Sequence, residues 1–254
     1  LGPHDANWYH SLIDQGALIA HWDRSGLRRQ GVKLVLSSYW HYRWPELPSI
    51  FGLAPDEYVW MNCDRVEFEQ ITFPGNVRGR GRNSLGAWSF ADPADIAHLR
   101  EIVLRNLGPK SEYSGAYVAI DRRDGWRTDR VQGYSTMLQR LVDDFGFRAV
   151  RLGEIRPKQQ LQLFRDAKVV IGEHGAGLSG MLAVSPETSL IEVFPDSNQN
   201  LGVYGFAHLA ECLDHRRHFR YVASEIADIP SQLLRILNSG GTKAHIRSDV
   251  SVRD

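Results

Sequence analysis

The second half of the chain alternates between short apolar runs and amphipathic segments of helical period. Apolar runs that alternate with helices of about ten residues predict parallel strands covered by helices on both faces. We therefore expect an α/β domain with a parallel sheet over residues 111–240, followed by a polar tail over residues 241–254. The predicted strands span residues 116–120, 148–152, 168–171, 190–194 and 218–222, and the predicted helices span residues 131–145, 157–167, 203–212 and 229–237.

The first 110 residues are less regular, and we expect them to form a second α/β domain. Apolar residues with helical spacing occupy residues 7–31, and a second helix is predicted from Asp92 to just before Gly108. The aromatic and proline-rich stretch at residues 39–48 is predicted to be a loop. Strands are predicted at residues 32–37, 58–61 and 66–73.

Composition argues against several classes of protein. The chain has 254 residues with 30 basic and 30 acidic side chains, and this zero net charge argues against a general nucleic-acid binder. Cys63 and Cys212 lie far apart and in no metal-binding spacing. We therefore expect reduced core thiols typical of a cytosolic protein, with a single disulfide as the alternative. No apolar run approaches the length of a membrane span.

The most specific motif is the turn GEHGAGL at residues 172–178, which follows an apolar run. Ligands bind at the carboxyl ends of strands in open α/β sheets, so this turn lies where a binding site is expected. Glycines let backbone amides approach an anion, and a helix N-terminus favours negative charge. Glu173 in the turn and Glu192 on the next strand could hold ribose or sugar hydroxyl groups. The alternatives are an ordinary strand-to-helix turn and charges that terminate strands.

Two further clusters carry side chains suited to catalysis or phosphate binding. His10 and Asp14 are four residues apart, so they share one helix face and could act as an oriented general base. The alternative is a capped helix with an interfacial histidine. Arg122 and Arg130 follow the strand at residues 116–120, where the forked hydrogen bonds of arginine suit phosphate oxygens. The alternative there is a solvated run of charges.

The sequence contains no Walker loop, zinc pattern, serine nucleophile elbow or three-glycine dinucleotide fingerprint. Instead, the three clusters in this order resemble glycosyltransferase family 61, which is known for its His-Gly-Ala-Gly-Leu signature. The resemblance extends from Asn7 to about Tyr221, which is nearly the whole chain. The matching positions are Asn7 to Asp14, Arg122 and Arg130, the glutamine-containing segment at residues 158–164, the GEHGAGL turn and the IEVFP strand at residues 191–195.

The resemblance implies a GT-B-like fold, in which two Rossmann-like domains with parallel sheets face each other across a cleft. Residues 1–110 would form the acceptor side, and residues 111–240 would bind a nucleotide-sugar donor. The implied reaction is inverting transfer of the sugar to a hydroxyl group of a glycan or glycolipid acceptor, without a metal or cofactor. Family habit further implies a bacterial enzyme of capsule or lipopolysaccharide synthesis, in the cytoplasm or attached to the inner face of the membrane.

The resemblance also implies roles for individual residues. The base that deprotonates the acceptor is expected to be Asp14 or His10, with Glu173 as a further candidate. No residue is expected to bind a metal. The donor is expected to contact Arg122, Arg130, His174, Gly175, Ala176, Gly177, Leu178 and Glu192.

The sequence departs from the family pattern at two places. Gly180 stands where the family often has asparagine, and residues 131–134 stand where the arginine segment commonly continues to an Asn-Glu pair. Many members also carry a longer region before Asn7. Two alternatives remain: a non-catalytic nucleotide-sugar-binding protein on the same fold, and another nucleotide-dependent enzyme such as a phosphorylase.

Overall fold

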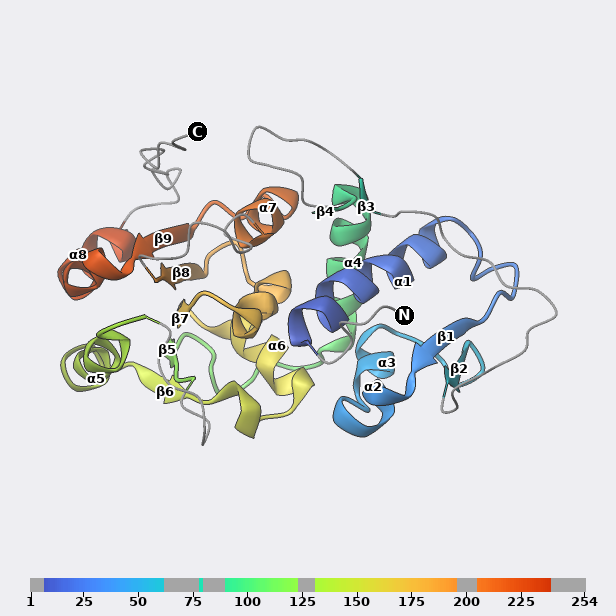
Figure 1. The fold of residues 1–254 in the computed structure, drawn as a ribbon, viewed down its shortest axis with the longest axis horizontal. Helices are drawn as coiled ribbons and strands as arrows, with labels where there is room; N and C mark the ends of the chain where they lie inside the picture. Colours follow the sequence, from blue (N-terminus) through green and yellow to red (C-terminus); the bar gives the residue numbers. More distant parts are fainter. Residues whose placement is uncertain (1–6, 62–77, 80–89, 123–130, 196–204, 239–254) are drawn as a thin grey trace.

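The computed structural model describes residues 7–61, 78–79, 90–122, 131–195 and 205–238. Its largest sheet has five parallel strands in the order β6-β5-β7-β8-β9 (left half of Figure 1). A helical segment follows every strand, which confirms the α/β class and the parallel sheet expected from the alternating pattern. The strands are β5 (Tyr117–Ile120), β6 (Arg148–Val150), β7 (Val169–Glu173), β8 (Ser189–Phe194) and β9 (His218–Val222).

Helical segments cover both faces of this sheet. On one face α5 (Tyr134–Phe145), η4 (Ala223–Asp228) and α8 (Ile229–Asn238) enclose a core cluster with alternate residues of β5, β7 and β8. The other face is covered by η3 (Ala176–Ala183) and two α-helices. These are α6 (Pro157–Asp166), which follows β6 and the short η2 (Leu152–Glu154), and α7 (Gly205–Cys212). Because both faces are covered, β7 and β8 are buried along their whole length.

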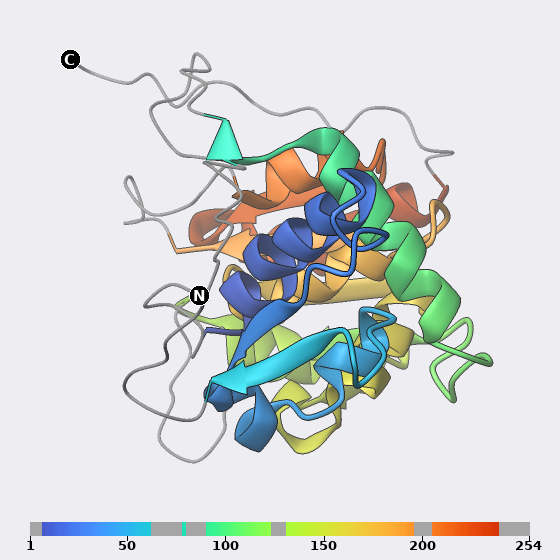
Figure 2. The ribbon, with the colours of Figure 1, turned by 90° about the vertical axis from the view of Figure 1, so that its right-hand side faces the viewer.

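The N-terminal part packs on the second helical layer. Helix α4 (Pro93–Asn106) contacts α1 (Gln15–Arg24) on one side and α7 and η3 on the other, and Figure 2 shows α1 and α4 side by side. A π-helical turn, η1 (His10–Asp14), precedes α1 and contacts η3. The remaining elements are β1 (Leu34–Ser37) parallel to β2 (Tyr58–Met61), β3 (Arg78–Gly79) antiparallel to β4 (Phe90–Ala91), α2 (Ser38–Arg43) and α3 (Leu47–Ile50).

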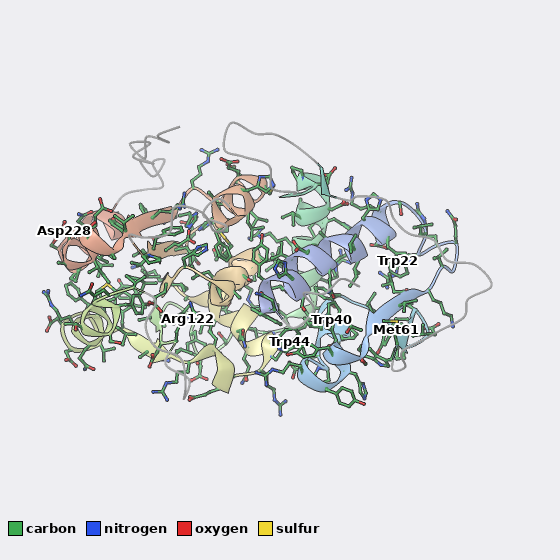
Figure 3. All side chains as sticks on the ribbon, in the orientation of Figure 1. Trp22, Trp40, Trp44, Met61, Arg122 and Asp228 are labelled. Carbon is green, nitrogen blue, oxygen red and sulfur yellow. The ribbon has the colours of Figure 1, made fainter. Side chains whose placement is uncertain are left out.

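The prediction of a loop at residues 39–48 was wrong, because the chain forms two short helices there. Ser37 caps α2 by accepting a hydrogen bond from the Tyr39 amide at 3.2 Å. Trp40, labelled in Figure 3, is fully buried and donates its indole hydrogen to the Ser11 hydroxyl at 3.1 Å. Trp40 is therefore part of the core of the N-terminal part. The predicted strand at residues 66–73 and the tail at residues 241–254 lie outside the described residues.

One large apolar cluster joins the N-terminal part to the sheet. It contains Leu99 and Leu107 from the α4 segment together with Leu161 and Phe164 from α6, all fully buried. The division into two domains near residue 110 stays a prediction, since residues from both sides share this cluster. Within the described ranges, no helix is long and apolar enough to cross a membrane.

A buried histidine lies just before β9. His215 is 7% exposed, and burial lowers its pKa to about 4, with the positive charges of His218, Arg100 and Arg217 acting in the same direction. The histidine is therefore neutral in the folded protein over most of the acidic range. An unfolded chain would protonate the same side chain near pH 6.5.

We expect the free energy of unfolding to fall as the pH drops from 6.5 towards 4, because the unfolded chain then binds a proton that folded His215 excludes. The full contribution is about 3 kcal/mol for this difference in pKa. Urea unfolding across this pH range, monitored by circular dichroism, measures the slope. The slope should be smaller in His215→Gln and unchanged in His41→Gln, a control at an exposed position. Equal slopes in wild type and His215→Gln would contradict the assignment.

Candidate active site at the carboxyl edge of the sheet

The strand order places two of the predicted motifs at one crevice. The chain runs from β5 outward to β6 and then returns to β7 on the other side of β5, so the order reverses between β5 and β7. Ligands in open α/β sheets bind at such a switch point, beyond the carboxyl ends of the strands. Arg122 follows β5 and His174 follows β7, and the Arg122 guanidinium donates to the His174 carbonyl oxygen at 3.3 Å (Arg122 is labelled in Figure 3).

The glycine turn is held against the sheet by its own small residues. A Cβ atom at Gly172 would lie 3.0 Å from Leu178 and 3.1 Å from Ile120, so glycine lets Leu178 pack into the core. Gly175 has φ 150° and ψ 180°, a conformation that favours glycine. The Leu178 amide donates to the Gly175 carbonyl oxygen at 2.9 Å and thereby closes the turn into η3.

This packing leaves a short exposed surface on the turn. His174, Gly175, Ala176 and Gly177 are half-buried, whereas every residue from Leu178 to the end of η3 is buried. The first amides of a helix lack acceptors within the helix and can bind an anion there. Leu178 is therefore placed in the core, whereas the four residues of the turn from His174 to Gly177 remain accessible.

Glu192 lies beneath His174 and is fully buried. Its carboxylate accepts a hydrogen bond from His174 Nδ1 at 2.6 Å and another from His218 Nε2 at 3.0 Å, and Arg220 Nε lies 3.5 Å from the same oxygen as His218. Burial by itself would raise the pKa of Glu192. The hydrogen bonds from both histidines and the charges of His218 and Arg220 outweigh burial and hold this pKa below its ordinary value.

Glu192 was predicted to hold sugar hydroxyl groups, but its side chain has no exposed surface in the structure. Both carboxylate oxygens are engaged inside the protein, with His174 on one and His218 on the other. An ionised carboxylate only accepts hydrogen bonds, so His174 carries a hydrogen on Nδ1 and presents Nε2 to other partners. Glu192 is thus arranged to orient His174.

Glu173 takes a different partner from its neighbour His174. It is 3% exposed and accepts a hydrogen bond from the Val131 amide at 2.7 Å. Val131 belongs to the core on the α5 and α8 face, whereas Glu192 shares its face with Leu190 in the larger cluster. The structure therefore places Glu173 on the opposite face of the sheet from Glu192, next to the start of the α5 segment.

Aromatic contacts connect the His10–Asp14 pair to His174 at the carboxyl edge of the sheet. His10 Nδ1 lies 2.7 Å from Asp14 Oδ2, as the four-residue spacing predicts. The rings of His10 and Tyr9 lie 5.6 Å apart, Tyr9 and Phe206 lie 5.5 Å apart, and Phe206 and His174 lie 5.6 Å apart. Two histidine–carboxylate pairs from distant parts of the chain are thus joined by two aromatic side chains.

Several residues of this arrangement were not predicted. Phe194 stacks on His174 with ring centroids 4.7 Å apart, and the Arg220 guanidinium lies 4.5 Å from the Phe194 ring. His218 and Arg220 are two residues apart, so a strand places them on one face, but only the position of β9 beside β8 directs them to Glu192. Arg130 lies outside the described residues.

The geometry offers cations, backbone amides and histidine–carboxylate pairs. Arg122, the accessible amides of the turn and His174 lie together at the switch point. The His10–Asp14 pair is separated from them by the rings of Tyr9 and Phe206. Within the described ranges, no three histidine, cysteine, aspartate or glutamate side chains are grouped as metal ligands. The absence of a metal from the reaction stays a prediction.

Comparison with known proteins finds similarity to glycosyltransferases. Residues 82–191 match the family model described as Glycosyltransferase 61. A segment of 91 residues, 33% of this chain, is 30% identical to a beta-1,2-xylosyltransferase of Oryza sativa subsp. japonica and covers 16% of that protein. The chain therefore matches only a small part of this relative. The family match contains Arg122 and the whole glycine turn.

Gly180, where the resembling family often has asparagine, has no room for a side chain. A Cβ atom there would lie 2.1 Å from Phe164 Cδ2 and 2.4 Å from Phe164 Cε2. Phe164 is fully buried in the larger core cluster, so its ring cannot move aside without repacking. In this chain the glycine allows α6 and η3 to pack closely beneath the glycine turn.

We expect Gly180→Ala to lower the free energy of unfolding by about 1–3 kcal/mol, the usual cost of overpacking a core. The double variant Gly180→Ala with Phe164→Leu should recover part of this loss, because the smaller side chain removes the clash. Gly177→Ala is the matched control, since its Cβ atom would lie 3.3 Å from the flexible end of Leu152. Denaturant unfolding measures all three, and an unchanged stability of Gly180→Ala would contradict the packing described here.

Proposed function

We propose that this chain is an inverting glycosyltransferase that transfers a sugar from a nucleotide-sugar donor to a hydroxyl group of a glycan acceptor. One observation carries the proposal: the Tyr9–Phe206 contact connects the His10–Asp14 pair to Arg122 and His174 at the switch point. An inverting transfer needs a base on one side of the anomeric carbon and a site for the leaving diphosphate on the other. These two groups supply candidates for both.

On the donor side, the leaving diphosphate would bind Arg122 and the half-buried turn from His174 to Gly177. Arginine forms paired, charge-assisted hydrogen bonds with phosphate oxygens, and backbone amides at the start of η3 add fixed dipoles. Preorganised donors of this kind stabilise negative charge as it develops on the leaving group. This scheme assigns the stabilisation to protein groups, with no metal or cofactor.

On the acceptor side, we assign the base to His10, oriented by Asp14. His10 is the more exposed of the two, at 31% against 17%, and its Nδ1 is directed to the carboxylate. The base takes the proton of the acceptor hydroxyl while the acceptor oxygen attacks the anomeric carbon and the bond to the diphosphate breaks. Attack opposite the leaving group inverts the configuration. Asp14 acting directly and Glu173 are the other assignments to test.

The proposal also extends to the arrangement and setting of the reaction. Residues 1–110 would provide the acceptor side and residues 111–240 the donor side of a GT-B-like enzyme, and the resemblance to the family supports this division. The same resemblance supports an acceptor in bacterial capsule or lipopolysaccharide and a place in the cytoplasm or on the inner face of the membrane. Because the matched relative is a xylosyltransferase, nucleotide-activated xylose is the first donor to test.

We expect uridine or guanosine diphosphate to bind the protein and Arg122→Ala to raise the dissociation constant by about tenfold or more, the cost of losing charge-assisted hydrogen bonds. Arg122→Lys should restore only part of the affinity, because lysine lacks the fork. Isothermal titration calorimetry measures these constants. Arg156→Ala, at an 80% exposed arginine beside Glu46, is the matched control.

Transfer from the corresponding nucleotide sugar should persist in EDTA. Full donor binding and full transfer by Arg122→Ala would show that the diphosphate assignment is wrong. Binding without transfer to any of a panel of glycan acceptors would favour the non-catalytic alternative.

We expect His10→Gln to lower kcat by a factor of about 100 to 10,000 while leaving the dissociation constant of the nucleotide unchanged, since a general base contributes this much. Asp14→Asn should have a similar but smaller effect, because the amide can accept a hydrogen bond without stabilising the protonated imidazole. Glu173→Gln tests the remaining assignment. Steady-state kinetics with saturating donor separates the three, and an unchanged kcat in His10→Gln would remove this residue from the mechanism.

A further inference from the structure

The buried carboxylate of Glu192 lies beneath His174 in the candidate site. Donor binding by arginine and backbone amides does not explain why it is there. A fully buried carboxylate is costly unless its charge is compensated. Glu192 meets this condition with His174 in the turn after β7 and with His218 and Arg220 on β9, and these partners hold its pKa below the ordinary value. Because no part of Glu192 is exposed, its carboxylate does not itself contact a ligand.

His174 is the partner of Glu192 that reaches the surface of the site. Its ring is fixed on three sides: Nδ1 by the carboxylate, one face by the stacked Phe194 ring, and an edge by Phe206. The ring therefore cannot rotate to exchange its two nitrogens. Nε2 is the polar atom that His174 directs to other partners, and His174 is 12% exposed against 5% for His218.

The protonation state of Nε2 decides what it can bind. A neutral ring with its hydrogen on Nδ1 carries a lone pair on Nε2, which repels phosphate oxygens. A protonated ring presents an N–H donor with a positive charge, which suits a phosphate. The buried negative charge of Glu192 stabilises the protonated ring, as the carboxylate of a histidine–carboxylate pair does in general.

We propose that His174 binds the diphosphate of the nucleotide as a protonated imidazole, and that Glu192 is the positioning residue that holds it in this form. This inference rests on the proposed function, because it takes a nucleoside diphosphate as the ligand. Binding moves one proton from the solvent to His174 Nε2. The proton stays on the nitrogen while the bond between sugar and diphosphate breaks, and it returns to the solvent when the diphosphate dissociates.

The charges around His174 set the conditions for this proton uptake. The negative charge in direct contact is that of Glu192, while His218 and Arg220 on β9 compensate Glu192 from the far side. Arg122 touches the His174 carbonyl oxygen, so a second cation stands at the same site and opposes protonation until an anion binds. The other titratable groups on the surrounding elements are His10 and Asp14 on η1, Glu173 on β7, Tyr221 on β9, and His208, Glu211 and Cys212 on α7.

The test is calorimetric titration of the full chain with uridine diphosphate and with guanosine diphosphate at mildly alkaline pH. Each titration is repeated in two buffers of different ionisation enthalpy, and the difference in heat gives the number of protons taken up. We expect an uptake that approaches one proton per nucleotide, and a dissociation constant that rises by up to about tenfold per pH unit under these conditions.

Three variants locate the proton. His174→Asn should bind the nucleotide more weakly and without proton uptake. Glu192→Gln should raise the dissociation constant about tenfold at neutral pH and shift the onset of the pH dependence to lower pH. His208→Asn, at a histidine on the neighbouring helix whose Nε2 contacts Cys212, should keep the proton uptake of wild type. Should Glu192→Gln fail to fold, the wild type and His174→Asn still decide the matter.

The outcomes separate this inference from the proposed function. Nucleotide binding without proton uptake by the wild type would overturn the inference and leave the proposed function intact. Uptake that persists in His174→Asn would also overturn it, because the proton would then reside elsewhere. If neither nucleotide nor any nucleotide sugar binds, the proposed function fails and this inference fails with it.

Discussion

The carboxyl edge of the sheet depends on one buried negative charge. The Glu192 carboxylate on β8 has partners on β9 and in the turn directly after β7, so a single side chain connects three neighbouring segments of the sheet edge. Removing one partner of a buried ion pair typically costs about 3–5 kcal/mol, because the remaining charge is left uncompensated. The alignment of these strands and the position of His174 are therefore stabilised by the same interaction, and neither can change without the other.

The N-terminal part of the candidate site depends on apolar packing. Tyr9 meets Phe206 at the start of α7, and η1 contacts η3, so the His10–Asp14 pair reaches the sheet edge only because α7 and η3 already cover the sheet. Aromatic contacts carry geometric preference as well as buried area. The two histidine–carboxylate pairs are therefore positioned by different interactions. The His174–Glu192 pair is held by buried charges, and the His10–Asp14 pair by aromatic rings at a partly exposed contact.

Local patterns in the sequence predict the sheet and one wall of the site. Alternating apolar runs predict all five strands of the sheet, and the position of Arg122 after β5 follows from that pattern alone. The burial of Glu192 does not follow from that pattern, because His218 and Arg220 lie on the neighbouring strand β9, and the order of the strands is a property of the fold. The helix at Trp40 was missed for a different reason, since its signal was the capping residue Ser37 just before the aromatic stretch. The link from His10 to His174 joins segments far apart in the sequence, which residue spacing does not reveal.

The position of α4 has a consequence for how such a chain can be recombined. This helix lies between α1 on one side and α7 with η3 on the other, and its residues belong to the cluster that spans both halves of the chain. Because α4 packs against helices of both halves, separating the halves would expose apolar side chains of this helix. A cut at residue 110 would transfer α4 together with α1, and would replace the helix that packs against α7 and η3.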